Sequence, residues 1–196
     1  MKKLLLILLC VPLIGVGQTA EEYFDKAYDY EKNGEYQLAI DNYTKCLRVD
    51  PDYADAYYNR GLAYGKGLYN LEDAISDFTR AIRIDPDYTN AYYNRGFAYD
   101  ELGNYEDAIA DYTRAIRIDP DYADAYYNRG TVYGRYLGNY EDAIADFTRA
   151  IRIDPDYANA YANRGTAKWY LKLDYCGDFK IACDLGRCNN YNNFCK

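Results

Sequence analysis

Residues Thr89–Tyr122, TNAYYNRGFAYDELGNYEDAIADYTRAIRIDPDY, decide the fold of this 196-residue chain. In the first half Tyr92, Gly96 and Tyr99 recur at spacings of four and three, which places them on one face of a helix. The apolar residues between 108 and 118 follow the same period, so we expect a second helix there. The small residues would let the two helices pack closely, and the tyrosine rings would fill the remaining space.

Gly103, Asn104 and Pro120 set the ends of these two helices. Gly103 suits the left-handed backbone position that follows a helix C-terminus. Asn104 is a good N-cap for the second helix, and Asp107 three residues later resembles a capping box. Pro120 ends the second helix, because proline lacks an N–H and disfavours helical backbone before it. The stretch is therefore predicted to form a helix–turn–helix hairpin.

Close copies of this hairpin lie on both sides of it. A single hairpin cannot bury its apolar faces alone, so we expect the copies to stack into an array. Two copies are one residue longer, and we place the extra residues in the turns at 65–70 and 135–138. The repeats are 20–53, 54–88, 89–122, 123–157 and 158 onward, where the fifth copy degenerates.

The spacing of the recurring residues resembles that of the tetratricopeptide repeat (TPR), in which large-x2-Leu-Gly-x2-Tyr is followed by Ala-x3-Phe, Ala and Pro. The matching residues of the central copy are Tyr92, Gly96, Tyr99, Ala108, Tyr112, Ala115 and Pro120. Arg95 departs from the pattern, because the family usually has an aliphatic residue there. The resemblance covers about residues 20–170. It implies an all-α solenoid, a right-handed superhelix whose concave face is lined by the first helix of each repeat.

An arginine recurs one residue before the small contact position of each first helix. We expect each arginine to pair with the second helix of the preceding repeat, which would form an Arg–Asp ladder along the array. Such partly buried pairs would fix the stacking geometry more than they add stability. The arginines are Arg60, Arg95, Arg129 and Arg164, and the facing positions hold Asn42, Asp77, Asp111 and Asp146.

The resemblance also implies a peptide-binding groove on the concave face. Tyrosine would provide rigid contact area there, and asparagine can pair with both the N–H and the C=O of an extended peptide. The candidate groove residues are Asp55, Tyr58, Asn59, Asn90, Tyr93, Asn94, Phe97, Asp124, Tyr127, Asn128 and Asn163. They could also be plain surface residues of the repeat. The functions considered are therefore a scaffold that binds a protein or peptide, an envelope carbohydrate or peptidoglycan module, and a spacer without a ligand.

One TPR subfamily grips the terminal carboxylate of chaperone peptides. It uses Lys and Asn in its first repeat, Asn in its second, and Lys and Arg in its third. Asn59 or Asn94 matches the second repeat. The other positions hold Phe24 and Tyr28 or Tyr58 and Leu62, and then Asn90 and Asn94 or Asp124 and Asn128. Since the cations are missing, we expect no grip on a terminal carboxylate.

The composition argues against an enzyme. The chain has no histidine, which excludes Ser-His-Asp and Cys-His arrangements and imidazole metal ligands. No glycine-rich phosphate loop follows a strand, because no strand is predicted. We therefore expect no catalytic residue, no cofactor and no metal site. The net charge of −8 argues against nucleic acid and anionic membrane surfaces as partners.

The N-terminus is typical of an export signal. A short basic region, Met1–Lys3, precedes an apolar run, Leu4–Ile14, which is too short to span a membrane. Small residues at the peptidase positions predict cleavage after Gly17, so residues 1–17 would be a signal peptide. A lipoprotein would be cleaved before Cys10, but the large Leu9 is a poor residue at that site. We expect an exported protein, periplasmic or secreted, without stable membrane insertion after cleavage.

Four cysteines crowd the segment 171–196, which follows the TPR solenoid of residues 18–170 and includes the degenerate end of its last repeat. Their spacing suits two short antiparallel helices, which would pair Cys176 with Cys195 and Cys183 with Cys188. These nested disulfides would cap the array. The other two connectivities and a four-cysteine zinc site are the alternatives. Cys46 takes a small-residue core position and is predicted to be a buried thiol.

Overall fold

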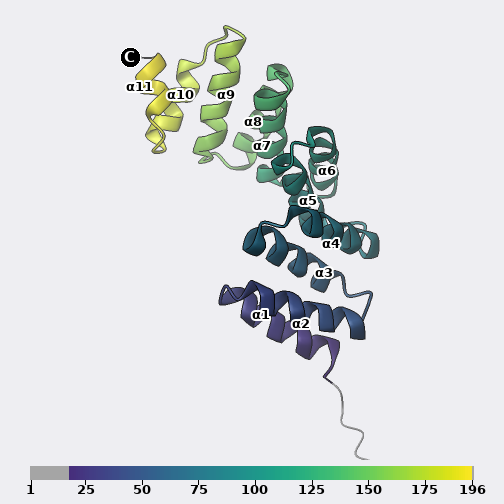
Figure 1. Cartoon of the computed structure of the whole chain (residues 1–196). Coiled ribbons are helices and arrows are strands. Elements are labelled where there is room, and N and C mark those ends of the chain that lie inside the picture. The colour runs from purple at the N-terminus through teal and green to yellow at the C-terminus, as the bar shows by residue number, and fades with distance from the viewer. Residues whose placement is uncertain (1–17, 196) are drawn as a thin grey trace, which may run out of the picture.

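The computed structural model describes residues 18–195, which form helices and no strand. Successive helices pack as hairpins, and the hairpins follow one another in a curved stack (Figure 1). The helices are α1 (Ala20–Lys32), α2 (Tyr36–Val49), α3 (Ala54–Leu62), α4 (Leu71–Ile84), α5 (Thr89–Glu101), α6 (Tyr105–Ile118), α7 (Ala123–Thr131), α8 (Tyr140–Ile153), α9 (Ala158–Tyr170), α10 (Cys176–Asp184) and α11 (Asn189–Phe194). The predicted all-α solenoid of helix–turn–helix repeats is confirmed.

Each first helix from α3 to α9 carries a glycine where it meets the second helix of its own hairpin. A Cβ atom at Gly61 would lie 2.8 Å from the ring of Phe78, and one at Gly165 would lie 2.6 Å from the ring of Phe179. The glycines of α5 and α7 have neighbours at 3.0 to 3.1 Å. No side chain fits these gaps without a shift of its neighbours. The prediction that small residues let the paired helices approach closely is therefore confirmed.

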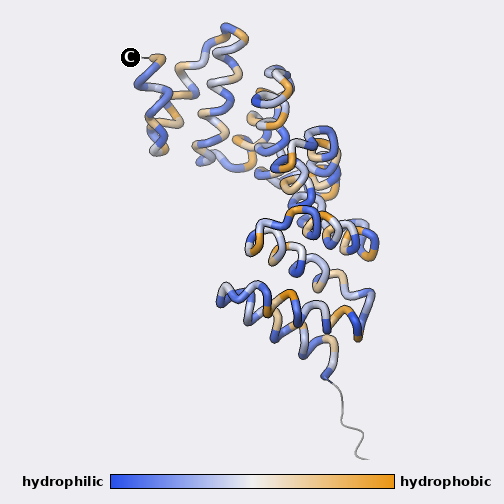
Figure 2. The backbone as a smooth tube through the Cα atoms, in the orientation of Figure 1, coloured by the Kyte–Doolittle hydropathy of each residue, from blue (hydrophilic) through white to orange (hydrophobic). Residues whose placement is uncertain are grey.

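Alanines and aromatic rings share the buried interior. Ala108, Tyr112 and Ala115 of α6 have no exposed surface, and Ala143 and Ala150 of α8 are buried in the same way. Hydrophobic and hydrophilic residues interleave along the helices (Figure 2). No helix within residues 18–195 is long and apolar enough to cross a membrane. The predicted signal peptide at 1–17 lies outside the described residues.

Cys46 lies in the core of the first hairpin. It has no exposed surface and forms no disulfide, so the prediction of a buried thiol is confirmed. Burial raises the pKa of this thiol to about 11. At neutral pH the sulfur is therefore protonated and unreactive.

The turn after α5 has the predicted left-handed residue, because Gly103 has a φ of +77°. The capping prediction for Asn104 is wrong in its detail, since its side chain makes no capping hydrogen bond. The same motif does cap the longer repeats. Asn70 accepts from the backbone N–H of Asp73 at 3.2 Å, and Asn139 accepts from Asp142 at 3.3 Å.

The extra residue of repeats 2 and 4 is taken up within the first helix, before the turn in which it was expected. Two π-helices, η1 (Ala63–Gly67) and η2 (Val132–Tyr136), continue α3 and α7. A π-helix holds more residues per turn than an α-helix, so it absorbs an insertion without ending the helix. It also brings its last residue against the preceding hairpin. A Cβ atom at Gly67 would overlap Tyr36, while the ring of Tyr136 stacks on Tyr105 at 4.4 Å.

The fifth hairpin is complete. The sequence pattern degenerates after Gly165, but α10 takes the place of a second helix and packs on α9. Asp178 and Phe179 stand where Asp146 and Phe147 stand in the fourth hairpin, although the loop before them is shorter. Helix α11 then packs on α10 and ends the array.

Candidate binding face

The Arg–Asp ladder exists, but its pairing differs from the prediction. Arg95 Nε donates to Asp111 Oδ2 at 2.7 Å, and its Nη2 donates to Asp111 Oδ1 at 2.7 Å. The carboxylate thus belongs to the second helix of the same repeat. The link to the preceding repeat is Arg95 Nη1, which donates to Thr79 Oγ1 at 2.9 Å. The same arrangement recurs in Arg60–Asp77–Thr44, Arg129–Asp146–Thr113 and Arg164–Asp178–Thr148.

These ion pairs are buried. The side chains of Arg129 and Asp146 are 16% and 7% exposed. Burial raises the pKa of the Asp146 carboxyl, and the bidentate guanidinium limits that rise. The first repeat lacks the pair, because Lys26 and Asn42 occupy the two positions. Sequence reasoning missed Asp178, which the recurring Asp–aromatic dipeptide could have revealed.

The tyrosines and asparagines predicted to line the groove bond to one another across repeats. Asn128 donates its side-chain N–H to Tyr93 Oη at 2.9 Å. Burial and the charge of Asp124 raise the pKa of Tyr93 to about 12, so its oxygen stays a neutral acceptor. The equivalent bonds join Asn94 to Tyr58 and Asn163 to Tyr127, both at 3.1 Å.

A second row of bonds reinforces the first. Tyr88 donates to Asp55 at 2.7 Å, Tyr122 to Asn90 at 3.3 Å, and Tyr157 to Asp124 at 2.6 Å. The rings of Tyr58, Tyr93 and Tyr127 also pack on the rings of Tyr88, Tyr122 and Tyr157, with centroids 4.8 to 4.9 Å apart. Most candidate groove residues therefore hold neighbouring repeats together. The two that make no such bond are Asn59, which is half-buried, and Phe97, which is 45% exposed.

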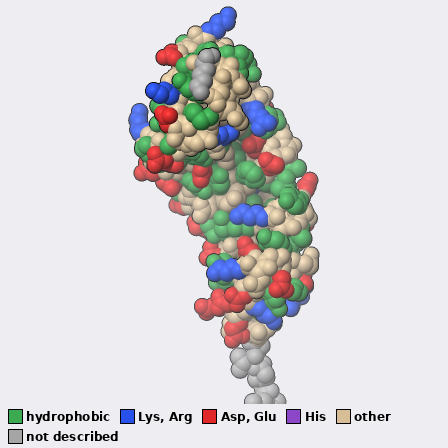
Figure 3. Space-filling model, turned by 90° about the vertical axis from the view of Figure 1, so that its left-hand side faces the viewer, with side chains coloured by type: hydrophobic (Ala, Val, Ile, Leu, Met, Phe, Trp, Pro, Cys, Tyr) green, Lys and Arg blue, Asp and Glu red, His purple; other side chains and the backbone are tan. Residues whose placement is uncertain are grey.

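We call the surface formed by α3, α5, α7 and α9, with η1 and η2, the groove face. Two pockets open on it. Pocket A has a volume of about 610 Å³ between the second and third hairpins, and Leu62, Phe78 and Phe97 line it. Pocket B has a volume of about 480 Å³ between the fourth and fifth hairpins. On the side of the stack drawn in Figure 3, hydrophobic side chains gather along the middle, with single Lys and Arg side chains among them.

The first and third repeats fill the matching space with an acid and a tyrosine. Tyr43 donates to Glu31 Oε2 at 2.9 Å. In the third repeat the acid is Asp100, which is one methylene shorter. Asp100 Oδ1 and the Tyr112 hydroxyl are both buried, and neither makes a well-formed hydrogen bond within the described residues. The Asn128 side chain, which donates to Tyr93, lies near the Tyr112 hydroxyl and offsets part of the rise that burial causes in its pKa. Burial, followed by the charge of Glu101, raises the pKa of Asp100 to about 6.

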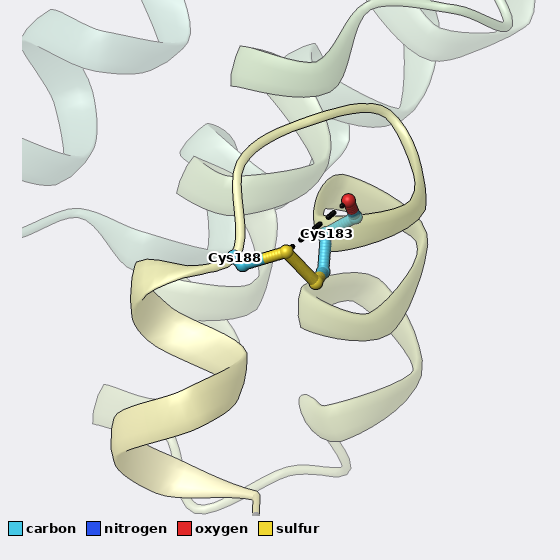
Figure 4. The surroundings of a disulfide bond; sticks show 2 residues. All are labelled: Cys183 and Cys188. Carbon is cyan, nitrogen blue, oxygen red and sulfur yellow. Dashed lines mark hydrogen bonds between the residues drawn. A yellow bond between two sulfur atoms is a disulfide. The ribbon is translucent and has the colours of Figure 1, made fainter.

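The C-terminal helices carry the nested cysteine pairs. Sγ atoms of Cys176 and Cys195 lie 1.97 Å apart, and those of Cys183 and Cys188 lie 1.99 Å apart. The second bridge closes the loop between α10 and α11, as Figure 4 shows. Gly186 in this loop has a φ of +97°. The rings of Trp169 and Phe194, 5.6 Å apart, pack α11 on α9 and add an apolar contact to the covalent one.

The face has the chemistry of a contact surface. Within residues 18–195, no three or more His, Cys, Asp or Glu side chains are grouped to hold a metal ion. Its tyrosines are neutral donors and acceptors, and the carboxylates of the ladder are paired with arginine. Asn94, Asn128 and Asn163 donate their side-chain N–H groups to tyrosines and keep the side-chain oxygen as an acceptor. Such groups can form hydrogen bonds and apolar contacts with a ligand.

Comparison with known proteins identifies the repeat. The family model described as TPR repeat matches residues 27–67, 70–103, 98–135 and 135–171. The chain belongs to the TPR-repeat family. No curated protein matches the sequence.

Solved structures share this fold. A crystal structure of MamA protein is 28% identical, with a TM-score of 0.80 over 92% of this chain and 97% of that one. YrrB, described as a TPR protein with an unusual peptide-binding site, is 22% identical, with a TM-score of 0.76 over 88% of this chain and 89% of its own. The first TPR of Spaghetti (RPAP3), bound to the HSP90 peptide SRMEEVD, is 32% identical. Its TM-score is 0.59 over 61% of this chain and 94% of that one.

Proposed function

We propose that this TPR protein is a non-enzymatic scaffold that binds an extended peptide segment of another protein on the groove face. The observation that carries the proposal is a groove face whose side chains are hydrogen-bonded between repeats and that has two open, largely unfilled pockets. Its tyrosine rings are fixed by hydrogen bonds to the next repeat, so little side-chain entropy is lost when a ligand binds. The similarity to a TPR that holds a bound peptide supports this function.

The ligand would differ from a chaperone C-terminus. Positions that carry cations in the carboxylate-clamp subfamily hold aromatic, apolar, amide or acidic residues here, such as Phe24, Tyr58, Asn90 and Asp124. All four of these side chains also belong to the contacts between repeats or helices. An internal segment of a partner fits this face better than a free carboxyl terminus.

The test is binding of purified residues 18–196 to an array of random peptides. Phe97→Glu places a charge on the groove face and should weaken peptide binding at least tenfold, because the apolar contact that the half-exposed phenylalanine ring would make with the peptide is lost. Ala110→Glu adds the same charge at an exposed position of the second helix α6 and should change nothing. Binding that survives Phe97→Glu would place the site elsewhere. Binding to peptidoglycan without any peptide would favour the carbohydrate function, and binding to neither would favour a spacer.

We also propose that the protein acts outside the cytoplasm, on the strength of the basic and apolar pattern of residues 1–17. Residues 1–25 fused to a reporter that is active only after export should give activity. Replacing Leu6 and Leu8 by Arg should abolish it, because the apolar run is interrupted. Equal activity of both fusions would refute export by this signal.

A further inference from the structure

Pockets A and B are copies of one site. A shift of 69 residues relates Leu62 to Thr131, Gly65 to Gly134, Lys66 to Arg135, Phe78 to Phe147 and Asn94 to Asn163, and each of these residues lines its pocket. Both pockets lie beside a π-helix, η1 or η2. The first and third repeats, which have no insertion, have no π-helix within the described residues. The insertion and the pocket therefore recur together.

The glycines at the two pockets leave space that a side chain could take. Neither Gly65 nor Gly134 has a positive φ, so the backbone conformation admits other residues. A Cβ atom at Gly65 would meet only Ala74 Cβ at 3.6 Å, an ordinary contact. Glycine within a helix is less favourable than alanine, because it loses more backbone entropy on folding. At Gly134 the space is tighter, because a Cβ atom would lie 3.1 Å from Ala143 Cβ, so only at Gly65 does the sequence leave the space empty without a conformational or steric need.

The other repeats show what closes the space. Where repeats 2 and 4 have glycine and phenylalanine, repeat 1 has Glu31 bonded to Tyr43, and repeat 3 has Asp100 beside Tyr112. The acid and the tyrosine hydroxyl form a plug. Open and plugged sites thus alternate along the array: plugged in repeat 1, open in 2, plugged in 3, open in 4.

The charge at the open sites indicates what would enter them. Among residues 18–195, neither Lys66 nor Arg135 forms an ion pair within 4.0 Å, although both line a pocket. Each lies near the acid of the preceding repeat, since burial raises the pKa of Glu31 and of Asp100, and the charges of Lys66 and Arg135, respectively, limit these rises. Arg187 adds a second cation at pocket B, where its guanidinium donates to Asn159.

In pocket A the cation lies beside apolar walls with Glu101 also present, and in pocket B the cations lie beside Phe147 and Ala167 together with polar residues such as Thr131 and Thr166. The chain as a whole has a net charge of −8. An apolar side chain with a carboxylate next to it matches both properties.

We propose that pockets A and B are equivalent subsites for one extended polypeptide, each taking a large apolar side chain whose neighbouring residue is acidic. Lys66 and Arg135 pair with these acidic residues, and Phe78 and Phe147 contact the apolar side chains. The plugged third repeat separates the two subsites. The inference rests on the proposed peptide-binding function and specifies its ligand.

The test begins with a random dodecapeptide phage library selected on immobilised residues 18–196. The enriched peptides should carry large apolar residues next to Asp or Glu. Their affinities are then measured by fluorescence anisotropy. Copying the plug of repeat 3 into pocket A, as Gly65→Asp with Phe78→Tyr, should weaken binding at least tenfold. Plugging pocket B as well, with Gly134→Asp and Phe147→Tyr, should weaken it at least about a hundredfold.

Charge reversal gives a second readout that does not touch the core. Lys66→Glu with Arg135→Glu changes two exposed side chains and should weaken binding about tenfold, and replacing the peptide's acids by lysine should restore it. Arg117→Glu, an exposed arginine on α6, is the matched control and should have no effect. If circular dichroism shows that a plugged variant is unfolded, the test of the subsites rests on the charge-reversal variant and its control.

The outcomes separate the two proposals. If peptides bind the wild type and their affinity does not change with the plugs or with charge reversal, the proposal of paired subsites is wrong. Peptide binding itself would still stand. Enriched peptides without acidic residues would overturn the role of Lys66 and Arg135. A library that yields no binding peptide would overturn peptide binding itself, and this inference with it.

Discussion

Replacing Asp100 by glutamate should stabilise the protein, although the change adds a methylene beside a buried tyrosine. In the first repeat the longer acid Glu31 accepts from the Tyr43 hydroxyl at 2.9 Å. In the third repeat the shorter Asp100 leaves its Oδ1 and the Tyr112 hydroxyl buried without partners. Asp100→Glu should restore the bond. A buried polar atom without a partner costs about 1 to 3 kcal/mol, and a bond to a charged acceptor contributes about 1.5 to 3 kcal/mol.

After the entropy lost by the longer side chain, we expect a net gain of about 1 kcal/mol in the free energy of unfolding. With a urea m-value of about 2 kcal/mol/M, this gain moves the unfolding midpoint up by about 0.5 M. The assay is urea unfolding followed by far-UV circular dichroism, on Asp100→Glu, Tyr112→Phe and the double variant. In the Tyr112→Phe background the gain from Asp100→Glu should vanish, because no hydroxyl remains to donate. A gain of equal size in both backgrounds, or a loss in the wild-type background, would refute the reasoning.

Three other predictions concern pH, the ladder and the cap. Because burial raises the pKa of Asp100 to about 6 in the folded state, above its unfolded value of about 3.9, folding favours the protonated acid, and the stability it contributes falls as pH rises from about 4 to 6. Asp100→Asn should therefore raise the free energy of unfolding, measured in urea, by about 1 kcal/mol more at pH 7.5 than at pH 4.5, relative to the wild type; this figure is reduced because Asp100 is partly exposed. An equal difference at both pH values would contradict the raised pKa of Asp100. Arg129→Ala should lower the free energy of unfolding by about 3 kcal/mol, because the buried Asp146 loses its partner. Adding Asp146→Asn should recover part of this loss. Additive losses in the double variant would mean that the two side chains contribute independently. Thiol titration of unfolded, unreduced residues 18–196 should find one thiol, that of Cys46, and a count of five would exclude the nested disulfides.

The helices and turns could be predicted because they depend on local chemistry. The spacing of Tyr92, Gly96 and Tyr99 fixes a helical face, and Gly103 marks the left-handed turn that the structure has. Both follow from the backbone preferences of a short segment. The same pattern recurs in each copy of the repeat, which is why the solenoid could be predicted from one stretch.

The partners of the arginines could not be predicted, because they depend on how helices cross. Asp77 and Asp111 lie at similar sequence distances from Arg95, on either side of it, and both distances can be bridged by a hairpin. Only the packing of α5 on α6 brings Asp111 within 2.7 Å and leaves Thr79 as the link to the preceding repeat. The spacing of these residues in the sequence does not show which aspartate pairs with Arg95.

The helices that carry the candidate groove residues could be predicted from the sequence, but the contacts of these residues could not. Tyr93 and Asn128 lie on neighbouring first helices, as the resemblance implied, yet they are occupied with each other. The open sites lie about two turns further along the first helix, at Gly65 and Gly134. Their signal was present in the sequence as an alternation of glycine with an acid. It becomes visible only when the four repeats are compared position by position.

The two ends of the array are built differently, and this gives its unfolding a direction. The last hairpin has the Arg164–Asp178 pair and is followed by a helix that two covalent bridges tie down. The first hairpin has Lys26 and Asn42 in place of such a pair. In a linear array each hairpin is supported only by its neighbours, so opening starts at the weaker end. Amide protons should therefore exchange fastest in α1 and α2 and more slowly toward α9, because the array unfolds from its N-terminal end.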